Sequence, residues 1–182
     1  MAYPRAQLPV LFGDSIFRRL LESHKSLFDP LSLRFCISGQ RIGNLIGKVR
    51  DSRTELKGRS VIVLIGTNDI LDRVSVEAIS KSIRDLIRYL RRQKCQISIC
   101  EILPIPRLGN LATPYSVVCE VNKYIRSFEP SGVKIIHTFN HFCTPLGIRV
   151  SLFCQTFGNS SRVDLVHPNV DGIECLLICL EV

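Results

Sequence analysis

Residues 61–69 read Val-Ile-Val-Leu-Ile-Gly-Thr-Asn-Asp and decide the fold class of this chain. The first five residues are aliphatic, and such a run is typical of a strand buried on both faces of a parallel sheet. Gly66 then interrupts the run and small polar residues follow, so we expect the strand to end there. The stretch predicts a buried strand whose carboxyl end carries an amide and a carboxylate.

Four more short apolar runs share this character, and longer helical patterns separate them. The predicted strands are residues 9–12, 33–37, 61–65, 96–102 and 133–136. The predicted helices lie at about 15–27, 42–57, 75–94 and 114–128, with a last one from about 170 to the end. This alternation predicts an α/β sandwich with a parallel sheet of about five strands. Residues 138–163 have the weakest pattern, and we expect them to form a long loop or lid.

Length and composition narrow the class of protein. The chain has 182 residues, of which 46% are hydrophobic, so it can bury a core and is not a disordered chain. We expect one domain over residues 1–182. The apolar runs are far shorter than the roughly 18 to 20 residues of a membrane span, and no signal-peptide pattern is evident, so we expect a cytoplasmic protein. The eight cysteines form no C-x-x-C pair, which predicts neither a disulfide framework nor a zinc site.

Polar residues follow several of the predicted strands and precede the last helix. They occur as Gly-Asp-Ser at 13–15, Ser-Gly-Gln at 38–40, Gly-Thr-Asn-Asp at 66–69 and Asp-Leu-Val-His-Pro at 164–168. The carboxyl ends of parallel strands meet at one edge of the sheet, where α/β proteins bind ligands. A hydroxyl, an imidazole, a carboxylate and amide donors at one edge are what acyl transfer requires.

Each of these groups has an expected role. Ser15 is the candidate nucleophile, His167 its general base, and Asp164 the group that holds the imidazole in its useful tautomer. The backbone N–H groups of Ser15 and Gly39 and the side-chain amide of Asn68 are the candidate donors of an oxyanion hole.

These motifs, in this order, resemble the SGNH (GDSL) hydrolase superfamily over almost the whole chain. The resemblance implies a flavodoxin-like, three-layer α/β/α sandwich and an esterase-like serine hydrolase acting on an ester or acyl substrate. It implies the same roles for Ser15, Gly39, Asn68, Asp164 and His167, and neither a metal nor an organic cofactor.

Taken singly, the same residues have ordinary structural explanations. Ser15 could serve as a helix N-cap, Asn68 and Asp69 as turn residues and His167 as a cap of the last helix. Four such coincidences at one edge of one sheet are much less expected than a single assembled site.

The positive charge raises the question of a partner. The formal net charge is +8, and 17 of the 24 cationic residues are Arg, whose planar fork suits phosphate. One group, Arg18, Arg19 and Arg41, is expected near the catalytic edge, where it would suit an anionic ligand. A second group follows the predicted helix 75–94, and it consists of Lys81, Arg84, Arg88, Arg91 and Arg92. A solvated helix face explains the second group equally simply, although acidic residues are scarce there.

Two functions, or a combination of both in one domain, therefore remain. The preferred one is a serine hydrolase, with an anionic substrate suggested by the nearby arginines. The alternative is a non-catalytic, SGNH-like domain of the OSK type that binds RNA through its basic surface. OSK-type domains are generally described as lacking the catalytic set, and this sequence departs from them by retaining it.

Overall fold

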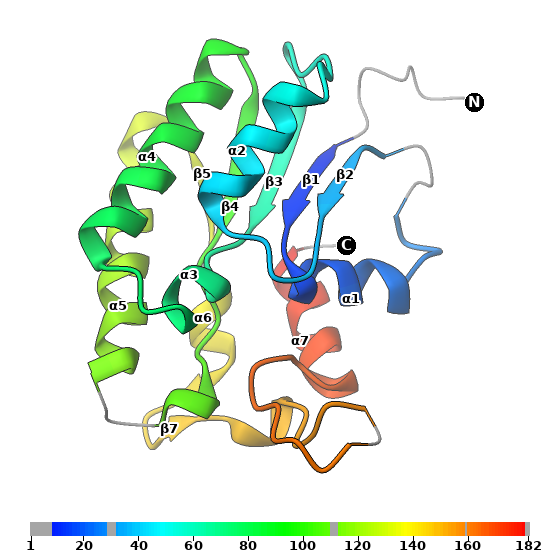
Figure 1. Cartoon of the computed structure of the whole chain (residues 1–182), viewed down its shortest axis with the longest axis vertical. Helices are drawn as coiled ribbons and strands as arrows, with labels where there is room; N and C mark the ends of the chain where they lie inside the picture. The colour runs from blue at the N-terminus through cyan, green and yellow to red at the C-terminus, as the bar shows by residue number, and fades with distance from the viewer. Residues whose placement is uncertain (1–8, 29–31, 110–112, 159, 181–182) are drawn as a thin grey trace.

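The computed structural model describes residues 9–28, 32–109, 113–158 and 160–180. Five parallel strands form the central sheet in the order β2-β1-β3-β4-β5, as Figure 1 shows. Their bounds are β1 Val10–Gly13, β2 Arg34–Cys36, β3 Ser60–Leu64, β4 Gln96–Cys100 and β5 Lys134–Ile136. The predicted parallel sheet of five strands is thus confirmed.

Helices cover both faces of the sheet. The main ones are α1 Ser15–Ser23, α2 Ile42–Asp51, α4 Val76–Arg92, α5 Thr113–Arg126 and α7 Val170–Leu180. The apolar sides of α2, α4 and α5 pack with Val10, Phe12 and their strand neighbours into one core. Those of α1 and α7 pack with Leu11, Leu64 and Cys100 into a second core on the opposite face. Alternate residues of each buried strand thus supply the two cores, and the three-layer α/β/α architecture is confirmed.

Capping side chains set the starts of α1 and α4. The carboxylate of Asp14 accepts a hydrogen bond from the backbone N–H of Ile16, and the hydroxyl of Ser75 accepts one from Ala78. Asp14, not Ser15, therefore caps α1, which leaves the Ser15 hydroxyl available for another partner.

Two predicted helices are too long. The helix expected at 15–27 ends at Ser23, and the one expected at 42–57 ends at Asp51. In the second case Arg53 adopts a left-handed conformation with φ of 51°, which no α-helix continues. A short helix, α3 Thr67–Leu71, follows β3 and was not predicted because five residues give no readable period.

The segment 138–163 contains more regular structure than a loop or lid. It includes α6 Thr138–His141, the hairpin β6 Cys143–Thr144 with β7 Gly147–Ile148, and the 3₁₀ turn η4 Val150–Leu152. Further 3₁₀ turns are η2 Pro106–Leu108 and η3 Glu129–Ser131. An isolated bridge pairs Phe153 with Pro168 and so fastens this segment to the one that carries His167.

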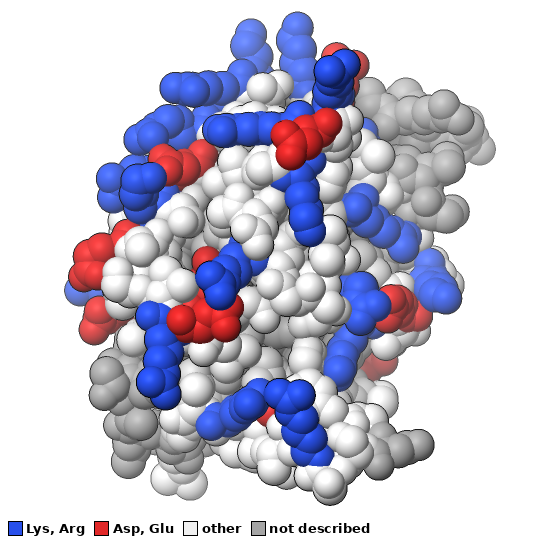
Figure 2. Space-filling view, viewed as in Figure 1, with Lys and Arg blue, Asp and Glu red and all other residues white. Residues whose placement is uncertain are grey.

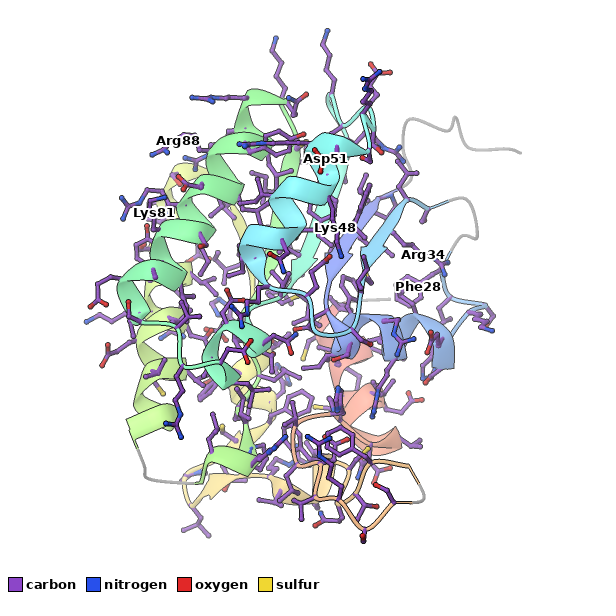
Figure 3. The ribbon with its side chains drawn as sticks, viewed as in Figure 1. Phe28, Arg34, Lys48, Asp51, Lys81 and Arg88 are labelled. Atoms are coloured by element: carbon purple, nitrogen blue, oxygen red, sulfur yellow. The ribbon has the colours of Figure 1, made fainter. Side chains whose placement is uncertain are left out.

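Charged side chains are unevenly spread on the surface. Figure 2 shows Lys and Arg side chains gathered over α4 and the end of α2, and in Figure 3 Lys81 and Arg88 point away from α4 into solvent. None of the helices in the described ranges is long and apolar enough to cross a membrane. The eight cysteines all lie in those ranges and form no disulfide bond.

Candidate active site

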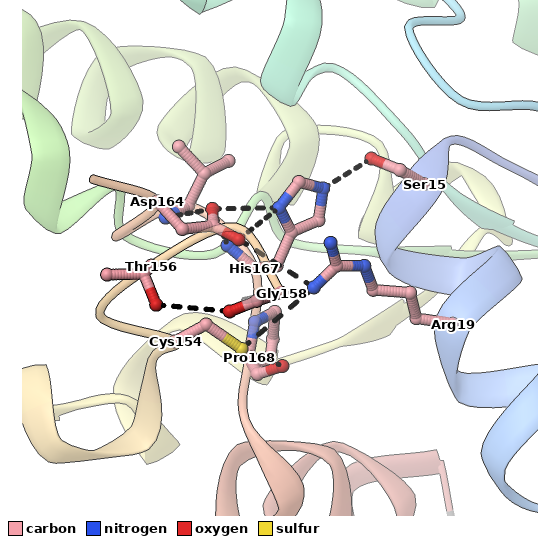
Figure 4. A network of polar contacts seen from close by, with 9 residues as sticks. Ser15, Arg19, Cys154, Thr156, Gly158, Asp164, His167 and Pro168 are labelled. Carbon is pink, nitrogen blue, oxygen red and sulfur yellow. Dashed lines mark hydrogen bonds and ion pairs between the residues drawn. The ribbon is translucent and has the colours of Figure 1, made fainter. Parts of the chain in front are cut away.

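Ser15 is the first residue of α1 and follows directly on the carboxyl end of β1. Its Oγ lies 2.8 Å from Nε2 of His167, which is 152 residues further along the chain (Figure 4). The structure therefore brings together the predicted hydroxyl and imidazole within hydrogen-bond distance.

Asp164 completes a chain of three groups. Its two carboxylate oxygens lie 2.8 and 3.0 Å from Nδ1 of His167, and the carboxylate is fully buried. Asp164 also accepts hydrogen bonds from the backbone N–H groups of Val166 and His167. An ionised carboxylate can only accept, so Nδ1 of His167 carries the proton and Nε2 is left with its lone pair toward Ser15. Leu165, between Asp164 and His167, adopts the left-handed φ of 48° at the turn that joins the two residues.

The electrostatic surroundings keep His167 neutral. Burial of the imidazole lowers the pKa of His167, and the positive charges of Arg19 and Arg18 lower it further, while the hydrogen bond to Asp164 opposes the change. A lowered pKa leaves the imidazole unprotonated near neutral pH, which is the state a general base needs.

The predicted oxyanion donors lie around the same cavity. No described residue accepts a hydrogen bond from the backbone N–H of Ser15 or of Gly39, and Gly39 adopts the left-handed φ of 72°. The amide of Asn68 donates one hydrogen bond to the Gln40 carbonyl, at 3.1 Å, and keeps a second hydrogen for another acceptor.

A cavity of about 350 Å³ opens beside these groups. Ser15, Gly39, Asn68 and His167 all line it. Its other lining residues are Arg18, Arg19, Ser38, Thr67, Leu71, Arg107, Phe157 and Val166. The volume suits a small ligand.

Sequence reasoning missed three of the lining residues, Leu71, Arg107 and Phe157, of which the last two contact the segment that carries Asp164 and His167. Arg107 lies in η2, after β4, and its backbone N–H donates to the Leu165 carbonyl. Phe157 presents its ring to the imidazole of His167, with 5.7 Å between the ring centroids. Neither residue stands in a motif; the aromatic content of 138–163 was the one available signal for Phe157.

Of the three arginines predicted to lie near the site, the structure places two at the cavity and one away from it. Arg18 and Arg19 line the cavity, and Arg19 also contacts the buried Asp164, with 3.7 Å between Nη1 and Oδ2. Arg41 forms an ion pair with Asp72 instead, and it is not among the residues that line the cavity.

The cations of α4 form a separate surface. Lys81 and Arg88 pair with Asp85, and Arg84 donates to the hydroxyl of Tyr124. Hollows of about 410 and 430 Å³ lie beside them, and the arginines that line one or both are Arg50, Arg84, Arg88, Arg91 and Arg92. We call Lys81, Arg84, Arg88, Arg91 and Arg92 the α4 basic surface.

Three or more metal-ligating side chains do not cluster anywhere in the part of the chain that the structure describes. The arrangement around Ser15 combines a hydroxyl, an imidazole, a carboxylate that orients the imidazole, and amide donors, which is the set of groups that nucleophilic chemistry uses.

Comparison with known proteins places this fold. The structure is similar to that of the C-terminal domain of the Drosophila Oskar protein, with a TM-score of 0.81 and 20% sequence identity over 98% of this chain and 94% of that one. It is also similar to the OSK domain of Drosophila Oskar, with a TM-score of 0.80 and 21% identity over 97% of this chain and 88% of that one.

Hydrolases share the fold as well. A GDSL-like lipase from Bacteroides thetaiotaomicron has a TM-score of 0.77 and 14% identity over 100% of this chain and 90% of that one. No curated protein matches the sequence. The sequence profile of the OSK domain matches residues 19–161, well over half of the chain. The chain therefore belongs to the OSK domain family.

Proposed function

We propose that this protein is a serine hydrolase of the SGNH type that cleaves an ester or acyl substrate. The observation that carries the proposal is the continuous chain of hydrogen bonds from Ser15 Oγ through His167 to the buried carboxylate of Asp164. A serine that served only as a helix cap would need no such chain, and in this protein Asp14 is the cap of α1.

The geometry supports a double-displacement mechanism. Ser15 Oγ attacks the substrate carbonyl while its proton passes to Nε2 of His167, and Asp164 stabilises the imidazolium that forms. The N–H groups of Ser15 and Gly39, with the free amide hydrogen of Asn68, stabilise the oxyanion. His167 then protonates the leaving alcohol, which departs and leaves an acyl group on Ser15. A water molecule then gives a proton to Nε2 of His167 and attacks the acyl carbon, and the acid leaves as His167 returns that proton to Ser15 Oγ.

The test is turnover of short p-nitrophenyl esters by the wild type, Ser15→Ala and a matched control, Ser82→Ala. Ser82 lies on α4, and its hydroxyl only donates to the Ala78 carbonyl one turn earlier. We expect Ser15→Ala to lose turnover and fluorophosphonate labelling and Ser82→Ala to keep both. Equal turnover in wild type and Ser15→Ala would remove the proposal.

RNA binding is the second candidate, favoured by the α4 basic surface. Its five cations lie on one helix with only Asp85 among them, and hollows lined by arginine adjoin it. Figure 2 shows that cations dominate the face of the molecule over this helix. Regularly spaced guanidinium groups beside open hollows can hold successive phosphates of a nucleic-acid backbone.

The salt dependence of RNA affinity distinguishes binding at the α4 basic surface from non-specific electrostatic binding. We expect the triple variant Arg84→Gln, Arg88→Gln, Arg91→Gln to bind single-stranded RNA more weakly and to reduce the slope of log affinity against log salt by about 2. The control removes an equal charge elsewhere through Lys25→Gln, Lys57→Gln and Lys123→Gln. No measurable binding near physiological ionic strength, or equal losses in the two triple variants, would exclude the α4 basic surface as an RNA site.

A further inference from the structure

The cavity beside Ser15 is strongly cationic. Arg18, Arg19 and Arg107 line it, and the described residues that line it include no Asp or Glu. A cavity meant for a plain acyl chain gains nothing from guanidinium groups, which must give up part of their hydration when an apolar group enters. The lining therefore carries information about the substrate of the proposed hydrolase.

The three arginines differ in how strongly their guanidinium groups already interact with carboxylates of the protein. Arg19 faces the fully buried carboxylate of Asp164, so its charge belongs largely to the catalytic chain. Arg18 pairs with Glu22 at 3.2 Å, but both side chains are about half exposed, where such a pair is weak. Arg107 makes no ion pair with any residue in the described ranges. Two guanidinium groups thus remain able to bind an anion.

The backbone holds Arg107 next to the catalytic groups. Its N–H donates to the carbonyl of Leu165, at 3.0 Å, and Leu165 lies between Asp164 and His167 in the chain. The position of η2 is therefore coupled to the loop that carries the acid and the base. Arg107 therefore stays next to the loop that carries Asp164 and His167, and its position does not depend on a long flexible segment.

The cationic character extends beyond the lining residues. The guanidinium of Arg162 lies over the ring of Phe157, 5.2 Å from its centroid, and that ring faces the imidazole of His167. The Phe157 ring, which lines the cavity, thus has a fourth positive charge over it. Cations at or beside the cavity thus come from three places, Arg18 and Arg19 on α1, Arg107 on η2 and Arg162 beside Phe157.

We propose that the cavity selects an ester whose acyl or alcohol part carries an anionic group, a carboxylate or a phosphate, bound by Arg107 with Arg18. Guanidinium groups bind such oxyanions through two parallel N–H donors, which fixes the orientation of the substrate as well as adding affinity. This inference rests on the proposed hydrolase function and specifies the class of its substrate.

Matched pairs of substrates test it. The p-nitrophenyl monoester of glutaric acid is compared with p-nitrophenyl valerate, which has the same acyl length without the carboxylate. Acetyl p-hydroxybenzoate is compared with p-tolyl acetate, so that the charge lies on the alcohol part instead. We expect kcat/KM to favour the anionic member of at least one pair by about tenfold, as one charge-assisted hydrogen bond would give. We expect this preference to shrink as ionic strength rises.

Variants connect the preference to the named side chains. In Arg107→Gln the ratio of kcat/KM between anionic and neutral esters should fall about tenfold, with a smaller fall in Arg18→Gln. The matched control is Arg53→Gln, in the turn after α2 at the opposite edge of the sheet, and it should keep the wild-type ratio. A wild-type preference for the neutral esters, or a ratio that Arg107→Gln leaves unchanged, would overturn the inference.

A binding measurement separates this inference from the proposed activity. Calorimetric titration of glutarate into Ser15→Ala, and into Ser15→Ala combined with Arg107→Gln, needs no turnover. Binding that is lost with Arg107 would support the anion site even if no ester were cleaved. Turnover of neutral esters without such binding would support the hydrolase and overturn the anion site.

Discussion

Replacing Asp14 with asparagine tests how the buried carboxyl beside Ser15 affects stability. Asp14 is 1% exposed; its Oδ1 accepts the capping hydrogen bond from Ile16, and its Oδ2 has no hydrogen-bond partner among the described residues. Burial raises the pKa of Asp14 from 3.8 to about 7, and the charge of Asp69 adds to the rise, while the capping hydrogen bond opposes it. A change of this size corresponds to about 4 kcal/mol of free energy.

The sign follows from proton binding. Between pH 3.8 and about 7 the folded protein keeps the proton on Asp14 and the unfolded chain loses it. The contribution of Asp14 to the free energy of unfolding is therefore most favourable below pH 3.8, falls by about 4 kcal/mol as the pH rises through this window, and stays low above it. Asparagine retains the capping oxygen but does not titrate, so Asp14→Asn should lack this fall.

Urea unfolding of the wild type and Asp14→Asn at intervals from pH 4 to pH 8 measures the difference. The variant should gain stability relative to the wild type as pH rises, by up to about 4 kcal/mol across the window. Asparagine can carry a constant cost for its buried amide, so the dependence on pH is the decisive quantity. Exposed Asp51→Asn is the control, with a curve parallel to that of the wild type. A stability difference between Asp14→Asn and wild type that is flat from pH 4 to pH 8 would refute the reasoning.

Three further outcomes are expected. A Cβ at Gly172 would lie 2.2 Å from the carbonyl oxygen of Leu152. Gly172→Ala should therefore lower the free energy of unfolding in urea by about 1 to 3 kcal/mol. A loss under about half a kilocalorie per mole would show that α7 shifts freely. Arg126 pairs with the fully buried carboxylate of Glu101, and the Arg126 side chain is 42% exposed. Arg126→Gln should therefore lower the free energy of unfolding by about 2 kcal/mol, measured by thermal or urea unfolding. An unchanged stability would mean that solvent replaces Arg126 as the partner of Glu101. Because burial lowers the pKa of His167, kcat/KM for a neutral ester should reach half its maximum below pH 6.5 and level off above it; a midpoint above that pH would contradict the placement of the imidazole.

The sheet could be predicted from the sequence because strand signals are local. The aliphatic run at 61–65 predicts a buried strand, and the structure has β3 at Ser60–Leu64. The end of α2 could not be predicted in the same way. Leu56 is apolar and buried and so continues the helical pattern, yet the chain leaves the helix at Ser52 and returns Leu56 to the core from an irregular segment. Period alone does not distinguish the two routes by which an apolar residue reaches a core.

The same contrast between local sequence signals and contacts that lack one applies to the candidate site. The grouping of Ser15, His167 and Asp164 could be predicted, because each stands in a short motif at a place that the topology brings to one edge. The position of Arg107 depends on a backbone hydrogen bond to Leu165, which is far away in sequence and has no signature in either segment. A contact made by backbone atoms is compatible with almost any side chain, so the residue types do not reveal it.

The long separation between Ser15 and His167 has a consequence for biosynthesis. At about 5 to 20 residues per second, a ribosome needs on the order of ten seconds to add the 152 residues that lie between the two positions. Throughout that interval the nascent chain has a serine without a base, so it cannot react with cellular esters or be acylated prematurely. In the proposed hydrolase, Ser15 becomes active only when the part of the chain that carries His167 has been made, and labelling of Ser15 would then report the completion of folding.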